Sequence, residues 1–175
     1  MLFSLDPTDR LKKFFEKIRH KYFSEDPLSL AQVMYCFWEG DKFAPDGSPV
    51  MGSARAFPAL IRDLFDCDFL ISIDHEYWKD ASTTDKKRLA IHELRHCSVI
   101  AERSKEGWTA KEDKEGRIRI TLRPHDVNLN LFKKEVEHCG LMAGEEDVAE
   151  KLLVMHHESK MVTPGKKKKK KKKKQ

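Results

Sequence analysis

The sequence STTDKKRLAIHELRHC at residues 82–97 joins a helix start to an HExxH motif at 92–96. Serine and threonine are favoured N-caps, and Asp85 suits the positive end of a helix dipole. Apolar residues follow at helical spacing. The segment therefore predicts a helix that begins at residues 82–84 and continues to Gly107.

Two histidines four residues apart lie on one face of such a helix, so both imidazoles can reach a single metal ion. Glu93, next to the first histidine, is then placed to act as general base on a water activated by the metal. The alternative is a helix that carries two histidines by coincidence. Because the motif follows a predicted strand and lies within a helical pattern, we interpret His92 and His96 as metal ligands.

A catalytic zinc ion of this type takes three protein ligands and keeps one position open for water. His125 is the first candidate for the third ligand, because it lies in RPHDV, between a predicted hairpin and a predicted helix. Glu135, Glu137 and His138 are the alternatives. Asp126 is interpreted either as a helix cap or as a partner that orients a ligand imidazole.

Five elements are expected before the motif. Helices are predicted at 8–23, 28–37 and 54–64, an exposed loop at 39–53, and a strand at 68–73. The loop EGDKFAPDGSPVMGS is rich in proline and glycine, which favour turns. The strand DFLISI is a short apolar run with β-branched residues.

After the motif, WTAKEDKEGRIRITL at 108–122 predicts a hairpin that turns near residues 114–116. Helices are expected at 126–137 and 145–157. Pro164-Gly165 then leads into nine lysines, a low-complexity run that is expected to be disordered.

The composition fits one domain at 1–160 followed by a basic tail at 161–175. The chain has 175 residues, 36% of them charged, and a mean hydropathy of −0.65. Its net charge is +5, and because the nine lysines from Lys166 to Lys174 contribute +9, the rest carries −4. The domain is therefore not expected to be a basic nucleic-acid binder. The tail can contact nucleic acid or another polyanion through charge alone, or act as a solubility tail.

The four cysteines are widely spaced and form no CxxC pair, which argues for free thiols and against structural zinc on cysteine. The start, MLFSLDPTDRLKKFF, has charged residues where a signal peptide has an apolar stretch. No apolar run approaches the roughly 18 residues of a membrane helix. We expect a cytoplasmic protein with no membrane contact.

Four segments in order resemble the phage metallopeptidase family: DFLISI, HELRHC, DKEGRIRI and HDVNLNLF, which begins at His125. More distantly, the chain is similar to SprT-like zincins. The resemblance covers about residues 30–142 and implies an α+β, minimal zincin-like fold with a small sheet packed on the HExxH helix. It also implies Zn2+ on His92, His96 and His125, with Glu93 as general base.

This interpretation predicts a zinc-dependent metallopeptidase that hydrolyses peptide bonds of a protein or peptide substrate. The substrate is expected to add as a strand along residues 69–73, taken as the sheet edge. The donor that stabilises the oxyanion stays open among Tyr77, His138 and Arg123.

Two alternative functions stay open. One is a non-catalytic zincin-fold regulatory module that acts on DNA or a protein partner through the basic tail. The other is a metal-dependent amidase that cleaves a non-peptide amide. Glu93 favours an enzyme over the regulatory module, because a purely structural metal site needs no base beside its first histidine.

Overall fold

The structure is a computed structural model, and it describes residues 2–6, 9–45 and 47–125. The chain divides into two units, Met1–Cys139 and Gly140–Gln175, and every described residue belongs to the first. The helices predicted at 126–137 and 145–157, the lysine tail and the domain boundary at 160 all lie outside the described residues.

The centre of the fold is a four-stranded sheet with the strand order β1-β2-β4-β3. The strands are β1 (Leu2–Ser4), β2 (Val33–Glu39), β4 (Phe69–Asp74) and β3 (Gly52–Ala56). The inner pair, β2 and β4, is parallel, and each outer strand is antiparallel to its neighbour. The inner strands VMYCFWE and FLISID are nearly continuous apolar runs, as expected of strands covered on both faces.

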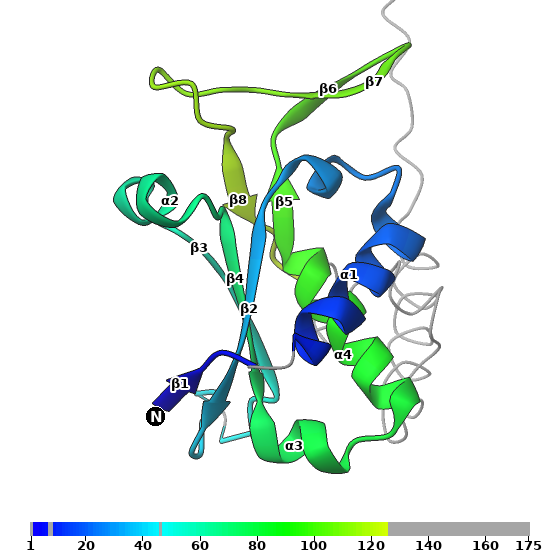
Figure 1. The fold of residues 1–175 in the computed structure, drawn as a ribbon, viewed down its shortest axis with the longest axis vertical. Helices are drawn as coiled ribbons and strands as arrows, with labels where there is room; N and C mark the ends of the chain where they lie inside the picture. Colours follow the sequence, from blue (N-terminus) through cyan, green and yellow to red (C-terminus); the bar gives the residue numbers. More distant parts are fainter. Residues whose placement is uncertain (1, 7–8, 46, 126–175) are drawn as a thin grey trace, which may run out of the picture. The chain divides into compact units, whose positions relative to one another are not determined.

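Two helices, α1 (Arg10–Phe23) and α4 (Thr83–His96), lie on the same side of this sheet (Figure 1). Alternate residues of the inner strands point toward them, and the apolar stripes of both helices close the core. On α1, α4, β2 and β4, the core residues are those with less than 2% of their surface exposed. They are Leu11, Phe15, Phe23, Trp38, Phe69, Ile71, Ile73, Ala90, Ile91 and Leu94. This packing fixes α4, and with it the HExxH motif, against the sheet.

Short elements complete the described part of the chain. They are the 3-10 helix η1 (Pro27–Leu30), the helices α2 (Ala59–Phe65) and α3 (His75–Asp80), and the strands β5 (Cys97–Val99), β6 (Ala101–Ser104), β7 (Gly107–Ala110) and β8 (Ile120–Leu122). β5 pairs with β8 and β6 pairs with β7, both antiparallel. No helix in the described residues is long and apolar enough to cross a membrane.

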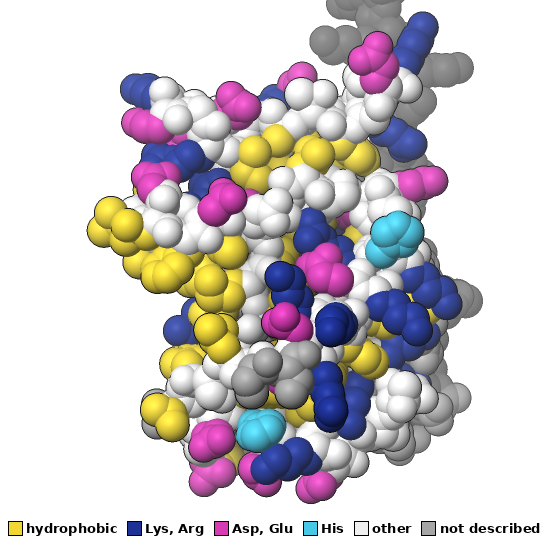
Figure 2. Space-filling model, in the orientation of Figure 1, with side chains coloured by type: hydrophobic (Ala, Val, Ile, Leu, Met, Phe, Trp, Pro, Cys, Tyr) yellow, Lys and Arg dark blue, Asp and Glu magenta, His cyan; other side chains and the backbone are white. Residues whose placement is uncertain are grey.

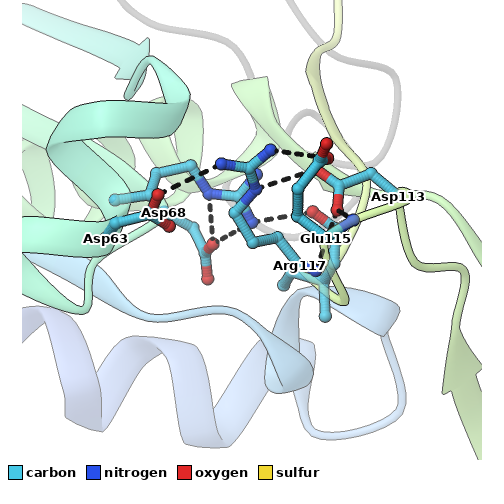
Figure 3. Close-up of polar contacts among 7 residues, drawn as sticks. Asp63, Asp68, Asp113, Glu115 and Arg117 are labelled. Carbon is cyan, nitrogen blue, oxygen red and sulfur yellow. Dashed lines mark hydrogen bonds and ion pairs between the residues drawn. The ribbon is translucent and has the colours of Figure 1, made fainter.

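An ion-pair network fixes α2 and the turn after β7 (Figure 3). The guanidinium of Arg62 on α2 donates to Asp68 Oδ1 at 2.6 and 2.9 Å and to the carbonyl of Ile118 at 2.7 Å. Arg117 donates to Asp63 on α2 at 3.2 Å and to Asp113 at 2.8 Å. The network therefore holds the 113–118 turn, and β8 behind it, against the start of β4.

The outer surface of α2 is apolar. Leu60, Leu64 and Phe65 remain between 57% and 68% exposed, and Figure 2 shows hydrophobic surface at the position of this helix. The helix is thus held to the fold by its arginine and aspartate side chains more than by apolar burial.

Several predictions of secondary structure are confirmed. α1 matches the helix expected at 8–23, and β4 matches the strand expected at 68–73. Helix α4 begins as expected, with the Ser82 hydroxyl accepting a hydrogen bond from Asp85 N at 3.1 Å. The predicted turn also forms, since Gly116 N donates to Asp113 O at 3.2 Å and Gly116 takes a φ of 78°. The α+β class is confirmed.

Two predictions before the motif are wrong. Residues 33–37, expected in a helix, form most of β2, because this run is rich in aromatic and apolar residues and pairs with β4 along its length. Residues 54–56, also expected in a helix, belong to β3, and the helix α2 starts only after Pro58. In both segments, pairing with β4 overrides the local helical pattern.

The end of α4, the helix that carries the HExxH motif, is also predicted wrongly. It was expected to continue to Gly107, but α4 ends at His96, and Cys97 is the first residue of β5. The segment Cys97-Ser98-Val99 pairs with β8, a non-local partner that helical spacing does not reveal. The residues expected as one hairpin at 108–122 are accordingly divided, since β7 pairs with β6 and β8 with β5.

Candidate metal centre

The two histidines of the HExxH motif lie on the last two turns of α4. Their ring centroids are 5.0 Å apart, and both side chains are half-buried. A separation of four residues places His92 and His96 on the same face of the helix, as predicted. The buried faces of Ile91 and Leu94 hold this part of the helix on the core.

His125 reaches the same point from the chain that follows β8. Its Nε2 lies 3.1 Å from the Nε2 of His92, and its ring centroid is 4.5 Å from that of His96. One ligand nitrogen from each of the three histidines lies within 4.8 Å of those of the other two. The structure therefore brings together the three residues that the sequence analysis selected. The alternative third ligands, Glu135, Glu137 and His138, lie outside the described residues.

The three imidazoles suit a metal ion of the zinc type. In a tetrahedral site with Zn–N bonds of about 2.0–2.1 Å, neighbouring ligand nitrogens are roughly 3.3 Å apart. The 3.1 Å approach of His92 and His125 is close to that spacing. Three neutral nitrogen donors, without a thiolate in the described cluster, are a ligand set of catalytic zinc sites.

Arg123 orients one of these ligands through its backbone. The carbonyl oxygen of Arg123 lies 2.9 Å from His96 Nδ1, and because a carbonyl can only accept, Nδ1 carries the proton. The other nitrogen of His96, Nε2, is therefore the one that could donate to a metal ion. In return Arg123 N donates to His96 O at 2.7 Å.

The local fold explains how this pair arises. Cys97 pairs with Leu122 in the β5–β8 ladder, so the residues just outside the ladder, His96 and Arg123, are brought together. The early end of α4 therefore starts β5, and the pairing of β8 with β5 brings Arg123 and, two residues later, His125 to the end of the helix. Arg123 also donates from its guanidinium to Ser98 Oγ at 3.4 Å. Of the other predicted oxyanion donors, Tyr77 lies on α3, and His138 is outside the described residues.

Glu93 is buried, with only 3% of its surface exposed. It lies against the backbone of Gly52, the first residue of β3. A Cβ atom at position 52 would come within 2.8 Å of Glu93 Cδ and 2.9 Å of Cγ, and still closer to Oε1. Gly52 is thus needed for space, a function that the sequence analysis missed because it assigned this glycine to a loop.

The expected substrate edge is corrected by the sheet order. Residues 69–73 were predicted as the edge, but β4 lies between β2 and β3. Its apolar residues on both faces are those of an inner strand. The edge strand next to α4 is instead β3, whose sequence GSARA consists mostly of small residues.

The described cysteines, Cys36, Cys67 and Cys97, are free thiols, as predicted. Cys139 lies outside the described residues. Cys97, next to the second metal-ligand candidate, is 1% exposed, and burial raises the pKa of its thiol. It therefore acts as a packing residue.

Comparison with known families gives one match of nearly the whole chain. The model of a family described as "Putative phage metallopeptidase" matches residues 6–162. No curated protein and no solved structure gives a significant match.

Proposed function

Because the chain belongs to the phage metallopeptidase family, we propose that it is a zinc-dependent peptidase with its active site at the end of α4. One observation carries the proposal: three imidazole nitrogens, one each from His92, His96 and His125, converge on one point, and the buried Glu93 directly follows the first of these residues on α4. Three histidines are a known ligand set of catalytic zinc ions.

The three histidines would hold Zn2+ and leave one coordination position for water or substrate. When bound, the ion supplies an acidified water and a Lewis acid for the scissile carbonyl. His96 is already in the tautomer that such a ligand needs, because Arg123 O accepts its Nδ1 proton. The interior of α4 and the β5–β8 ladder keep all three rings in place.

Glu93 would act as the general base. Its carboxylate accepts the proton of the attacking water and then delivers that proton to the nitrogen of the leaving amine, so that one group serves both steps. A base must be held within hydrogen-bond reach of the reacting atoms. Burial and the close approach to Gly52 of β3 restrict the movement of the Glu93 side chain, which supports this role.

A peptide substrate would bind along the outer edge of β3. Strand addition uses backbone hydrogen bonds, so an edge strand with small side chains accepts many sequences. β3 has this character, and its first residue contacts Glu93. The substrate strand would thus pair with β3, and not with β4 as predicted from the sequence.

Peptide cleavage tests this function. The zinc-loaded protein and its Glu93→Gln variant are incubated with a mixed peptide library, and products are identified by mass spectrometry. We expect cleavage by the parent, inhibition by a zinc chelator, and a loss of at least a hundredfold in the variant, which keeps its metal. Equal cleavage by both proteins would remove Glu93 as base. Metal binding by both without cleavage would favour the regulatory module.

A further inference from the structure

The outward surface of α1 is basic. Each exposed residue of this helix carries a basic side chain: Arg10, Lys12, Lys13, Lys17, His20 and Lys21. Five of them, Arg10, Lys13, Lys17, His20 and Lys21, lie within about 100° of one another around the helix axis, and we call these five residues the α1 basic face. The single acidic residue of the helix, Glu16, is engaged elsewhere, by Arg19 at 3.3 Å and by the hydroxyl of Tyr35 at 2.7 Å.

Helix α4 extends the basic surface. Lys87 of α4 and Lys21 of α1 both lie over the ring of Tyr22, at 5.1 and 5.3 Å from its centroid. Their ammonium groups lower the pKa of the Tyr22 hydroxyl, with Lys87 the larger influence. Figure 2 shows lysine and arginine side chains gathered on the side of the molecule where α1 and α4 lie. The two helices thus present one continuous positive surface.

His20 and Lys21 suit the last turn of α1, but the rest of this charge does not serve the stability of the helix. Lys13, Lys17 and Lys21 follow one another at intervals of four, where like charges repel on a helix surface. The first turn holds basic residues and no acidic one, although the helix dipole favours the opposite sign there. A pattern that weakens the helix it stands on indicates a function outside the helix.

The overall composition conceals this surface. Without the lysine tail the chain is mildly acidic, which led us to expect no nucleic-acid binding by the domain. Net charge averages over the molecule, whereas a polyanion responds to the local field of the face that it meets. Helix α1 carries six lysine and arginine residues and one glutamate.

We propose that the α1 basic face, together with Lys87, binds the phosphate backbone of double-stranded nucleic acid without reading its sequence. The row from Arg10 to Lys21 is about 16 Å long at 1.5 Å per residue, which is long enough for several backbone phosphates to lie beside it. A membrane surface fits less well, because interfacial helices place apolar side chains beside their basic ones. The apolar residues of α1, such as Leu11 and Phe15, are buried in the core.

The test separates this face from the lysine tail. In the full-length chain, each lysine from Lys166 to Lys174 is first replaced by serine. In that background, Lys13, Lys17 and Lys21 are replaced by glutamine. The matched control replaces three exposed lysines on other elements, Lys79, Lys105 and Lys114, by glutamine. Binding to a fluorescent 20-base-pair DNA duplex is measured by anisotropy from 50 to 200 mM salt, and circular dichroism verifies folding.

We expect the α1 variant to bind DNA at least tenfold more weakly at 50 mM salt, and the control to stay within twofold. The slope of log Kd against log salt concentration should become shallower by about two to three in the α1 variant. Each lost phosphate contact lowers this slope by about 0.9. Equal effects of the two triple variants, or no effect of either, would overturn the proposal. So would loss of binding to phosphatidylserine vesicles with DNA binding unchanged.

Discussion

His96 and Arg123 exchange two hydrogen bonds, and through this exchange a backbone group sets the chemistry of a side chain. The carbonyl of Arg123 holds the proton of His96 on Nδ1 at 2.9 Å, and the amide of Arg123 donates to the carbonyl of His96. Any residue except proline can supply these groups at position 123, so the residue type gives little sign of the role. The pairing follows from the fold alone.

The tautomer of His96 can be measured directly. We expect long-range proton–nitrogen NMR spectra at pH 8 to show His96 protonated on Nδ1, both without metal and after zinc is added. Comparison with His96→Gln assigns the signals. A proton on Nε2 in the metal-free protein would contradict the orientation described for this ligand.

Gly52 and Glu93 form a second residue-scale contact with a measurable consequence. We expect Gly52→Ala to lower the kcat of peptide cleavage by about 100-fold, because a new Cβ displaces the carboxylate and a misplacement of about 1 Å has effects of this size. Zinc content should stay unchanged. Ser53→Ala, one residue further along β3, is the control and should keep its kcat. Wild-type kcat in Gly52→Ala would show that Glu93 tolerates the shift.

At the scale of elements, the decisive event is the end of α4 at His96. The HExxH spacing predicts the shared face of His92 and His96, since i and i+4 always share a face of a helix. The change to β5 at Cys97 depends on β8, more than twenty residues later, and no local pattern reports such pairing. The site was thus predictable from residue types, whereas the ladder that assembles it was not.

The network around Arg62 makes a further prediction at this scale. Arg62→Ala should lower the free energy of unfolding by about 3 kcal/mol, because it leaves Asp68, which is 8% exposed, as a buried charge without its guanidinium. Urea denaturation measures the change. Arg62→Met combined with Asp68→Asn should recover part of the loss, because no charge is then buried. A change below about 0.5 kcal/mol in Arg62→Ala would assign α2 no part in stability.

At the scale of the whole molecule, the arrangement of the strands limited what could be predicted. The inner strands β2 and β4 are both apolar, and an apolar run of six or seven residues fits either a buried strand or a short helix. The sheet order, which places β3 at the edge, depends on pairing between distant segments. Charge segregation onto α1 was equally hidden, because composition does not report which residues share a surface.

The buried cysteines and tyrosines give the molecule a predictable response to alkaline pH. Burial raises the pKa of Cys36 to about 11 from 9.0, and it also raises those of Cys97 and Tyr35. Above pH 9 the unfolded chain therefore loses protons that the folded chain keeps, so stability falls as pH rises. Cys36 alone should lower the free energy of unfolding by about 1 kcal/mol between pH 8 and pH 10.

Urea denaturation across this pH range checks the prediction. Cys36→Ala should show a smaller fall in unfolding free energy than the parent, by about the same 1 kcal/mol. Identical pH dependence in the two proteins would mean that the Cys36 thiol titrates normally in the folded state.

We propose that His92, His96 and His125 bind one metal ion. Zinc per chain, measured by elemental analysis after zinc loading and dialysis, tests it most directly in the parent and in His125→Ala, with His75→Ala as a control outside the cluster. We predict about one zinc per chain in the parent and the control, and a clear loss in His125→Ala. Equal zinc in the parent and His125→Ala, or none in the parent, would contradict the three-histidine site.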